Sequence, residues 1–201
     1  MQSNFILNDK MAAYLEHLAK VGIHNAAKGF SGMLGRELTV VDPKVCILPL
    51  LSLSTILGGP EDEVVGIYLR AEGDLGSQFM TVIPIQKAME LVDLLMDQPV
   101  GTTECLGSLE RSALAEVGNL TASFFMNSIA AISGISLRPT PPAVMVDMVG
   151  AILDIIIATS GGISDSVMML KAKFVLGERE VGVDFWVIPD EKTIRLLAAR
   201  I

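Results

Sequence analysis

The sequence predicts an α+β fold in which two fused pseudo-twofold repeats share an antiparallel sheet flanked by long helices. Three observations predict it: the two halves contain the same phrases in the same order, each half opens with a long helical pattern, and strand-like runs with short turns follow. Short turns imply antiparallel pairing, with helices covering one face. Each half alone has few strands and open edges, so we expect a single domain over residues 1–201, with repeats over about 1–100 and about 101–201.

The repeat is visible as four short phrases. They recur in the second half in unchanged order, and the offset between copies grows by a few residues at a time, as small loop insertions would produce. The pairs are Leu18–Gly22 with Leu114–Gly118, Pro43–Val45 with Pro142–Val144, Gly58–Val64 with Gly161–Val167, and Val82–Lys87 with Val187–Lys192.

Each half opens with a long helical pattern. The first extends from Asp9 to about Leu34 and the second from Ser108 to about Ile132, with Asp9 and Ser108 as candidate N-caps. We expect a short helix to close each copy, over Gln86–Met96 in the first and Glu191–Arg200 in the second.

Three strand-like runs follow the long helix of the second half. They cover Val144–Thr159, Val167–Leu176 and Val181–Ile188. Gly161 and Gly162 separate the first two, and the stretch Gly177–Glu180 separates the last two, which indicates hairpin turns. In the first half, the glycine- and acid-rich stretch Gly58–Glu63 has no lysine for a phosphate and is expected to be a turn.

Composition excludes several classes of protein. With 51% hydrophobic and 19% charged residues the chain is not disordered, and a net charge of −8 leaves no basic face for nucleic acid. Two histidines and two distant cysteines cannot form a zinc site, so no metal is expected. The amino terminus shows no secretory signal, and the longest apolar stretch, Val144–Thr159, contains two aspartates and is too short to span a bilayer. We therefore expect a cytoplasmic protein without membrane insertion.

The second long helix has a distinctive polar stripe. Ser112, Glu116, Asn119 and Ser123 recur at helical spacing, beside an apolar stripe of Ala113, Val117, Leu120 and Phe124. A helix with its polar side in water would give the same spacing. Against that alternative, the stripe carries only one charge, whereas solvated faces usually carry several Lys and Glu residues. Gly118 also costs about 1 kcal/mol relative to Ala in a helix interior, which suggests that another backbone approaches it closely.

These residues resemble a known signature. Ser112, Glu116, Asn119 and, twenty-two residues further on, Pro142 match the pattern of the CheC/CheX/FliY family of chemotaxis phosphatases, whose first position is Asp or Ser. The resemblance is strongest to the CheC branch, which is similarly a duplicated protein of about this length. It implies dephosphorylation of a phosphorylated CheY-type response regulator, with no cofactor of the chain's own and with Mg²⁺ bound in the partner's receiver domain.

The chemistry of the residues agrees with that implication. An aspartyl phosphate is already reactive, so a helper needs only to place a water in line. The carboxamide of Asn119 can hold a water without adding a charge that repels phosphate, and Glu116 can pair with a lysine of the receiver and so dock the helix. Gly118, Ser112 and Pro142 are supporting motif residues. Ser112 either orients Glu116 or is simply a small surface residue. A proline at the position of Pro142, before a strand, usually restricts the backbone and makes no contact with a partner.

The first copy lacks this pair. An offset of 96 places Lys20 opposite Glu116 and Ile23 opposite Asn119, and counting back from Pro43 with the family spacing gives Ala13, His17 and Lys20 instead. Neither alignment retains a carboxylate and an amide, so we expect one working site, in the second copy. The alternative function is a non-catalytic binding module of the same family, either a flagellar-switch component or an adaptor that docks the deamidase CheD.

Overall fold

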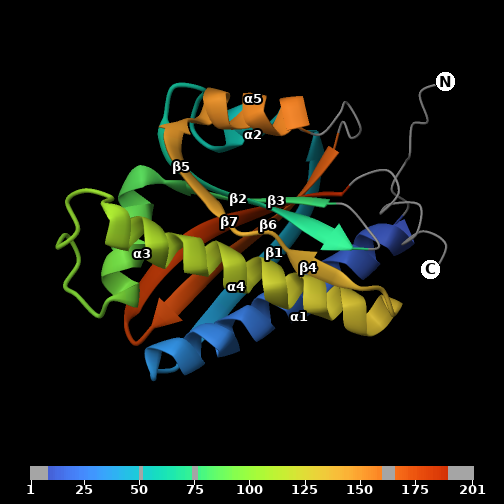
Figure 1. The fold of residues 1–201 in the computed structure, drawn as a ribbon, viewed down its shortest axis with the longest axis horizontal. Helices are drawn as coiled ribbons and strands as arrows, with labels where there is room; N and C mark the ends of the chain where they lie inside the picture. Colours follow the sequence, from blue (N-terminus) through green and yellow to red (C-terminus); the bar gives the residue numbers. More distant parts are fainter. Residues whose placement is uncertain (1–8, 50–51, 74–76, 160–165, 190–201) are drawn as a thin grey trace.

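A seven-stranded antiparallel sheet lies at the centre of the computed structural model, which describes residues 9–49, 52–73, 77–159 and 166–189 (Figure 1). The strands are β1 (Leu38–Pro49), β2 (Glu63–Gly73), β3 (Ser77–Pro84), β4 (Leu137–Pro139), β5 (Ala143–Met148), β6 (Ser166–Leu176) and β7 (Arg179–Pro189). The helices are α1 (Asp9–Leu34), α2 (Leu53–Ile56), α3 (Ile85–Leu95), α4 (Ser108–Ser133) and α5 (Val149–Thr159).

The two halves of the chain build this sheet together. Its strand order is β1-β6-β7-β3-β2-β4, and β5 also pairs with β2. The central pair is β3 with β7, one strand from each half. Strand β1 of the first half also pairs with β6 of the second, and β4 and β5 of the second half pair with β2 of the first. The predicted α+β fold with a shared antiparallel sheet is confirmed.

Helices α1, α3 and α4 cover one face of the sheet (Figure 1). The core on this side contains aromatic rings from helices and strands in edge-to-face contact: Phe30 of α1 lies 5.6 Å from Phe174 of β6, and Phe125 of α4 lies 5.6 Å from Phe79 of β3, between ring centroids. Such pairs add about 0.5–1.5 kcal/mol beyond the burial of their area. Both long helices are therefore fixed to the sheet by large buried side chains.

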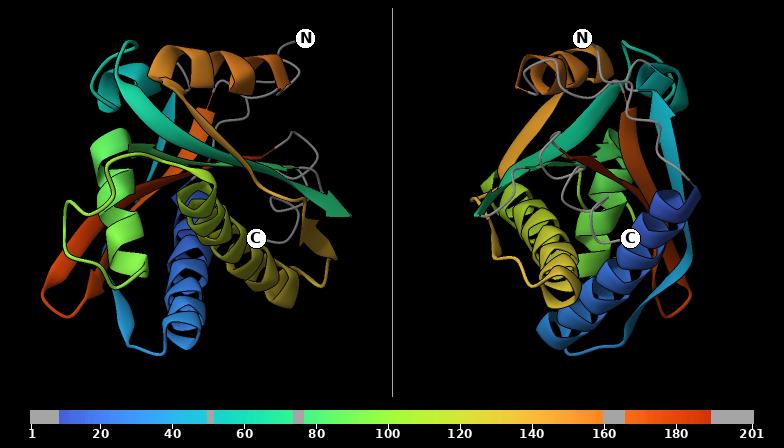
Figure 2. Two further views of the ribbon diagram at one scale, coloured as in Figure 1. Left: turned by 60° about the vertical axis from the view of Figure 1, so that its left-hand side comes forward. Right: turned by 90° about the vertical axis from the view of Figure 1, so that its right-hand side faces the viewer.

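The opposite face of the sheet is covered as well, which corrects the expectation that helices cover one face. Helices α2 and α5 lie there, as Figure 1 and Figure 2 show, over a second apolar cluster. The predicted strand Val144–Thr159 is wrong in its second part, because the chain bends into α5 at Val149. The buried residues of α5 recur at a spacing that suits a helix: Val149, Ile152 and Ile156. Gly66 of β2 leaves room for α5, since a Cβ on Gly66 would lie 2.9 Å from Cδ1 of Ile152.

Most other predicted elements agree with the structure. Helix α1 has the predicted bounds, α4 ends one residue later than expected, and α3 matches the first closing helix. Asp9 and Ser108 are each the first residue of their helix and not the N-cap; Gly107 occupies the cap of α4. The turn after Leu176 is present, with Gly177 at φ +63°, and residues 57–62 form turns and bends as expected. Gly161, Gly162 and the expected helix Glu191–Arg200 lie outside the described residues.

The connection between the two halves is held by a buried carboxylate. Asp93, 1% exposed, accepts hydrogen bonds from the backbone N–H groups of Gly101 (2.7 Å), Thr102 (3.2 Å) and Thr103 (2.8 Å). Burial by itself raises the pKa of this carboxyl, but the hydrogen bonds from Thr103, Gly101 and Thr102 outweigh it and hold the pKa below its ordinary value. This contact fixes the course of the chain shortly before α4 begins.

No helix among the described residues is long and apolar enough to cross a membrane. This agrees with the charged interruptions in the longest apolar stretch.

Candidate functional site

The helix α4 touches the sheet at Gly118. A Cβ placed on Gly118 would lie 2.5 Å from Cγ2 of Ile67 in β2, well inside the 3.5–4.0 Å of ordinary carbon contacts. The close approach expected at this glycine is therefore real, but it is to a side chain and not to another backbone. Because Asn119 follows Gly118 directly, the packing of Gly118 on Ile67 determines the distance of Asn119 from the sheet.

The predicted polar stripe faces outward. Ser112 is exposed, and Glu116, Asn119 and Ser123 are half-buried, so none of the four lies in the core. The apolar stripe differs from the prediction, since Val117 is buried but Ala113, Leu120 and Phe124 are only half-buried. The buried side of the helix is instead centred on residues one position further round the helix, namely Leu114, Gly118, Thr121, Ala122, Phe125 and Met126.

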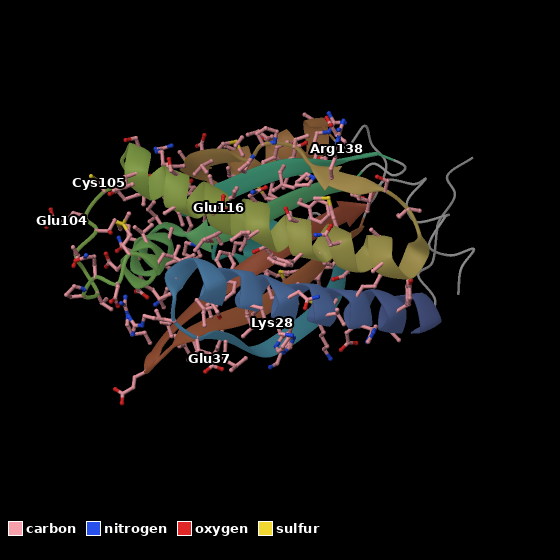
Figure 3. All side chains as sticks on the ribbon, turned by 60° about the horizontal axis from the view of Figure 1, so that its bottom comes forward. Lys28, Glu37, Glu104, Cys105, Glu116 and Arg138 are labelled. Carbon is pink, nitrogen blue, oxygen red and sulfur yellow. The ribbon has the colours of Figure 1, made fainter. Side chains whose placement is uncertain are left out.

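Glu116 and Asn119 have no competing partners. Over the described ranges, neither side chain makes a hydrogen bond or an ion pair with the rest of the chain. The two residues are three apart on one helix, and side chains at that spacing are neighbours. Figure 3 shows Glu116 in the first half of α4, in a view of the face formed by α1 and α4. A carboxylate and an amide are therefore both available to a molecule that approaches this face.

Ser112 does not orient Glu116. Its hydroxyl donates a hydrogen bond to the backbone carbonyl of Ser108, at 2.8 Å, within its own helix. This local bond is common for serine in helices and leaves the carboxylate without a serine partner. Of the two interpretations of Ser112, the small surface residue is the one that the geometry favours.

Pro142 marks a break in an edge strand. Residues 140–142 interrupt pairing with β2, between β4 and β5, and Thr140 fills the gap by donating its N–H to the carbonyl of Arg70 and accepting the Arg70 N–H at its hydroxyl. Proline has no N–H to donate to the ladder, so it suits this position. In the pairing of β5 with β2, Val144 lies opposite Ile67, and Pro142 is two residues before Val144. Pro142 therefore leads into the strand that pairs with β2, and β2 is the strand that Gly118 contacts through Ile67.

The equivalent face of the first half is different. Helices α1 and α4 both contain 26 residues, and their buried positions coincide when Asp9 is aligned with Ser108. In this register Ala13, His17 and Lys20 stand where Ser112, Glu116 and Asn119 stand in α4, in agreement with the count from Pro43. The offset of 96 is wrong for this helix, because it pairs the fully buried Ile23 with the half-buried Asn119.

A small cavity lies behind α4. Its volume is about 20 Å³, and its walls include Gly118, Thr121 and Ala122 of α4, Ile67 of β2 and Thr81 of β3. This is space for about one water-sized sphere. It is too small for a substrate, but it gives the side chain of Ile67 limited room to move.

Within the described part of the chain, no group of three or more His, Cys, Asp or Glu residues could hold a metal ion. Three contacts that fix α4 were not predicted from the sequence: Ile67 under Gly118, and Phe124 and Phe125 against glycines of α1. The glycines themselves are visible in the sequence as interruptions of helical patterns, but nothing in the sequence identifies what packs against them.

Comparison with known proteins agrees with the resemblance found in the sequence. The model of the CheC-like family matches residues 109–146, a range that contains Ser112, Glu116, Gly118, Asn119 and Pro142. The CheY-P phosphatase CheC of Bacillus subtilis is 28% identical over 149 residues, which are 73% of this chain and 71% of the relative.

Solved structures share the fold at low sequence identity. FliY from Thermotoga maritima matches with a TM-score of 0.75 at 16% identity and covers 97% of each chain. The FliM middle domain from H. pylori matches at 0.63 with 8% identity, over 96% of this chain and 99% of that one. The CheX–CheY–BeF₃–Mg²⁺ complex from Borrelia burgdorferi matches at 0.52 with 17% identity, over 86% of this chain and 97% of that chain. The resemblance to the CheC/CheX/FliY family is thereby confirmed.

Proposed function

We propose that this relative of the CheC phosphatases accelerates the hydrolysis of the aspartyl phosphate on a CheY-type response regulator in chemotaxis signalling. The observation that supports it most directly is the pair Glu116 and Asn119, which lie three residues apart on the outward side of α4 and have no partners among the described residues. The similarity to B. subtilis CheC supports the substrate, and the CheX–CheY complex shows a protein of this fold with a receiver as its partner.

The proposed reaction uses water as the nucleophile. A water molecule attacks the phosphorus atom, the bond between phosphorus and the aspartyl oxygen breaks, and inorganic phosphate and the free carboxylate are released. Asn119 holds this water in line by accepting a hydrogen bond from it at the amide oxygen, and the neutral amide does not repel the phosphoryl group. The chain needs no nucleophile of its own for this step.

Glu116 has a docking role in this proposal. Its carboxylate pairs with a lysine of the receiver through a charge-assisted hydrogen bond, and this fixes the depth to which α4 enters the pocket. Gly118 positions Asn119 through its contact with Ile67. We expect no cofactor of the chain's own, because the Mg²⁺ that neutralises the phosphoryl charge is bound by the receiver.

One comparison of variants tests the proposal. Phosphate release from a phosphorylated CheY-type receiver with Mg²⁺ is measured without the protein, with the wild type, and with Asn119→Ala and Asn127→Ala. Asn127 is the matched control, since it is an exposed asparagine of the same helix. We expect Asn119→Ala to lower kcat by about 100-fold or more, the usual cost of removing a group that positions a reactant, and Asn127→Ala to retain the wild-type rate. Equal decay with and without the wild-type protein contradicts the proposal.

A second candidate is a non-catalytic binding module. It is favoured by two observations: FliM structures share the fold, and the α1 position equivalent to Asn119 is Lys20, so the first half lacks the amide. In that case the chain would act as a flagellar-switch component or would dock CheD. Purified CheD that binds wild type and Asn119→Ala equally well, together with no phosphatase turnover, would support this candidate over the enzyme.

A further inference from the structure

Helix α1 packs against α4 through two of its glycines. The two helices lie side by side and run in opposite directions (Figure 3). Gly22 and Gly29 are seven residues apart, close to two helical turns, so they share one side of α1. A Cβ on Gly22 would lie 3.0 Å from Cα of Phe125, and a Cβ on Gly29 would lie 2.2 Å from Cε2 of Phe124. Ordinary carbon contacts are about 3.5–4.0 Å, so a side chain at either glycine requires α4 or the Phe124 ring to move.

The contacts of α4 with α1 and with the sheet bracket Asn119. Directly before Asn119, Gly118 rests on Ile67 of β2, and after it Phe125 meets Gly22 of α1. These two contact points are about 10 Å apart along the helix. A helix held at one point can still turn about that point, whereas a second contact with a different element fixes its direction and its rotation. The ring of Phe125 also lies 5.6 Å from that of Phe79, between centroids, so α1 and the sheet hold α4 at the same residue.

The position of Asn119 is sensitive to small movements of α4. Side chains of a helix end about 5–6 Å from its axis, so a rotation of about 10° moves the Asn119 amide by about 1 Å. An error of about 1 Å in the position of a reacting group can lower a rate about 100-fold. A Cβ on Gly22 would need about 0.5–1 Å more space than is present. The contact with α1 is therefore tight on the scale that matters for positioning a water.

Glycine in α1 has a cost that these contacts offset. Glycine forms helices poorly, so each glycine within α1 weakens the helix. At Gly22 and Gly29 any side chain would press on α4, whereas a Cβ on Gly32 would meet no atom within 4 Å. The first half has no carboxylate and amide pair, since Lys20 stands at the position of Asn119. Its helix therefore contributes to the candidate site through packing.

We infer that helix α1 is a positioning element of the candidate site, with Gly22 and Gly29 as the residues that hold Asn119 in place for hydrolysis. The inference rests on the proposed function. In this role neither glycine contacts the receiver or the attacking water, because each acts through Phe124 or Phe125 and the backbone of α4. The first half of the chain, which lacks a site of its own, thus determines the alignment of the site in the second half.

The experiment compares two pairs of matched glycine-to-alanine variants. Gly29→Ala is paired with Gly32→Ala, which adds a Cβ to the same helix where no atom lies within 4 Å. Gly22→Ala is paired with Gly150→Ala in α5, on the opposite face of the sheet, where the new Cβ would lie 3.2 Å from the carbonyl oxygen of Pro60. For each variant, the kcat and KM of phosphate release, the dissociation constant for the phosphorylated receiver, and unfolding in urea are measured.

We expect Gly22→Ala and Gly29→Ala to lower kcat by about 10-fold or more while KM and the dissociation constant change by less than about 3-fold. Alignment of the water depends more steeply on the amide position than docking does. The two controls should keep the wild-type kcat. When Phe124 is replaced by leucine, which lacks the Cε2 and Cζ atoms that the new Cβ would meet, Gly29→Ala should no longer lower kcat relative to Phe124→Leu alone.

Glycines that only stabilise the fold would change the urea midpoint and leave the kcat of the folded protein unaltered. Wild-type kcat in folded Gly22→Ala and Gly29→Ala, with Asn119→Ala inactive, therefore overturns the inference and leaves the proposed function intact. A loss of kcat in Gly29→Ala that persists alongside Phe124→Leu refutes the action through the ring. Absence of turnover by the wild type refutes the proposed function and the inference with it.

Discussion

The contact between Gly118 and Ile67 makes a quantitative prediction about Gly118→Ala. The new Cβ would lie 2.5 Å from Cγ2 of Ile67, about 1 Å closer than carbon atoms normally approach. Either Ile67 turns towards the small cavity beside it or α4 moves outward. Overpacking of this kind costs about 1–3 kcal/mol, and alanine in place of glycine returns about 1 kcal/mol of helix propensity, so the net loss of stability should be about 0–2 kcal/mol.

The effect on activity should be larger than the effect on stability. A displacement of Asn119 by about 1 Å can lower the rate by about 100-fold, because the water must be held in line with the breaking bond. The assay measures phosphate release at a saturating concentration of phosphorylated receiver, with unfolding in urea as the measure of stability. We expect kcat to fall about 10- to 100-fold in a variant that remains folded at the assay temperature.

Gly32→Ala is the matched control for this substitution. Gly32 lies in α1, and a Cβ there has no atom within 4 Å. The same change should therefore stabilise the fold by about 0.5–1 kcal/mol and leave kcat unaltered. A Gly118→Ala protein with wild-type kcat would refute the reasoning that this glycine positions Asn119. Partial recovery in Gly118→Ala with Ile67→Leu, which removes the Cγ2 branch, would support it.

Three further predictions concern stability. Asp93→Asn should lower the free energy of unfolding by about 1–3 kcal/mol, because an amide N–H₂ would face backbone donors. The folded-state pKa of Asp93 lies below its ordinary value, so the difference in stability from the wild type should be constant above about pH 5 and shrink as the pH falls below about 4. Urea unfolding at several pH values measures this difference. Phe30→Ala, which removes a fully buried ring and its contact with Phe174, should cost about 3–5 kcal/mol in the same assay, and a loss below about 1 kcal/mol would be inconsistent with the packing described. Gly73→Ala should lower Tm, because Gly73 has φ +127° and a Cβ would lie 2.2 Å from the carbonyl oxygen of Ser136, whereas Gly59→Ala, where no atom lies within 4 Å of the new Cβ, should have little effect.

Local patterns were sufficient for much of the fold. The bounds of α1 and α4 follow from helical periodicity over 26 residues, and α3 follows from a shorter pattern of the same kind. The stretch Val144–Thr159 shows where such patterns fail. It is apolar almost throughout, so neither the strand period nor the helix period stands out, and the change from β5 to α5 at Val149 depends on the apolar cluster and on Gly66 beneath α5.

The candidate site, too, could be predicted only in part from the sequence. The spacing of Ser112, Glu116 and Asn119 places them on one side of a helix whatever the surroundings, because 3.6 residues per turn is a property of the backbone. The side of α4 that is buried depends on Ile67, Phe124 and Phe125 and their contacts, and here the predicted apolar stripe was only partly correct. The alignment of α1 with α4 was likewise decided by burial, since the recurring phrases favoured an offset that pairs the fully buried Ile23 with the half-buried Asn119.

The sequence by itself determined the two long helices and the polar stripe, because both depend on the order of residues along one segment. The tertiary structure decided which strands pair across the two halves, that both faces of the sheet are covered, and how closely α4 approaches β2. These features depend on contacts between segments far apart in the chain. Such contacts are determined by how side chains pack together, which the local periodicity of the sequence does not show.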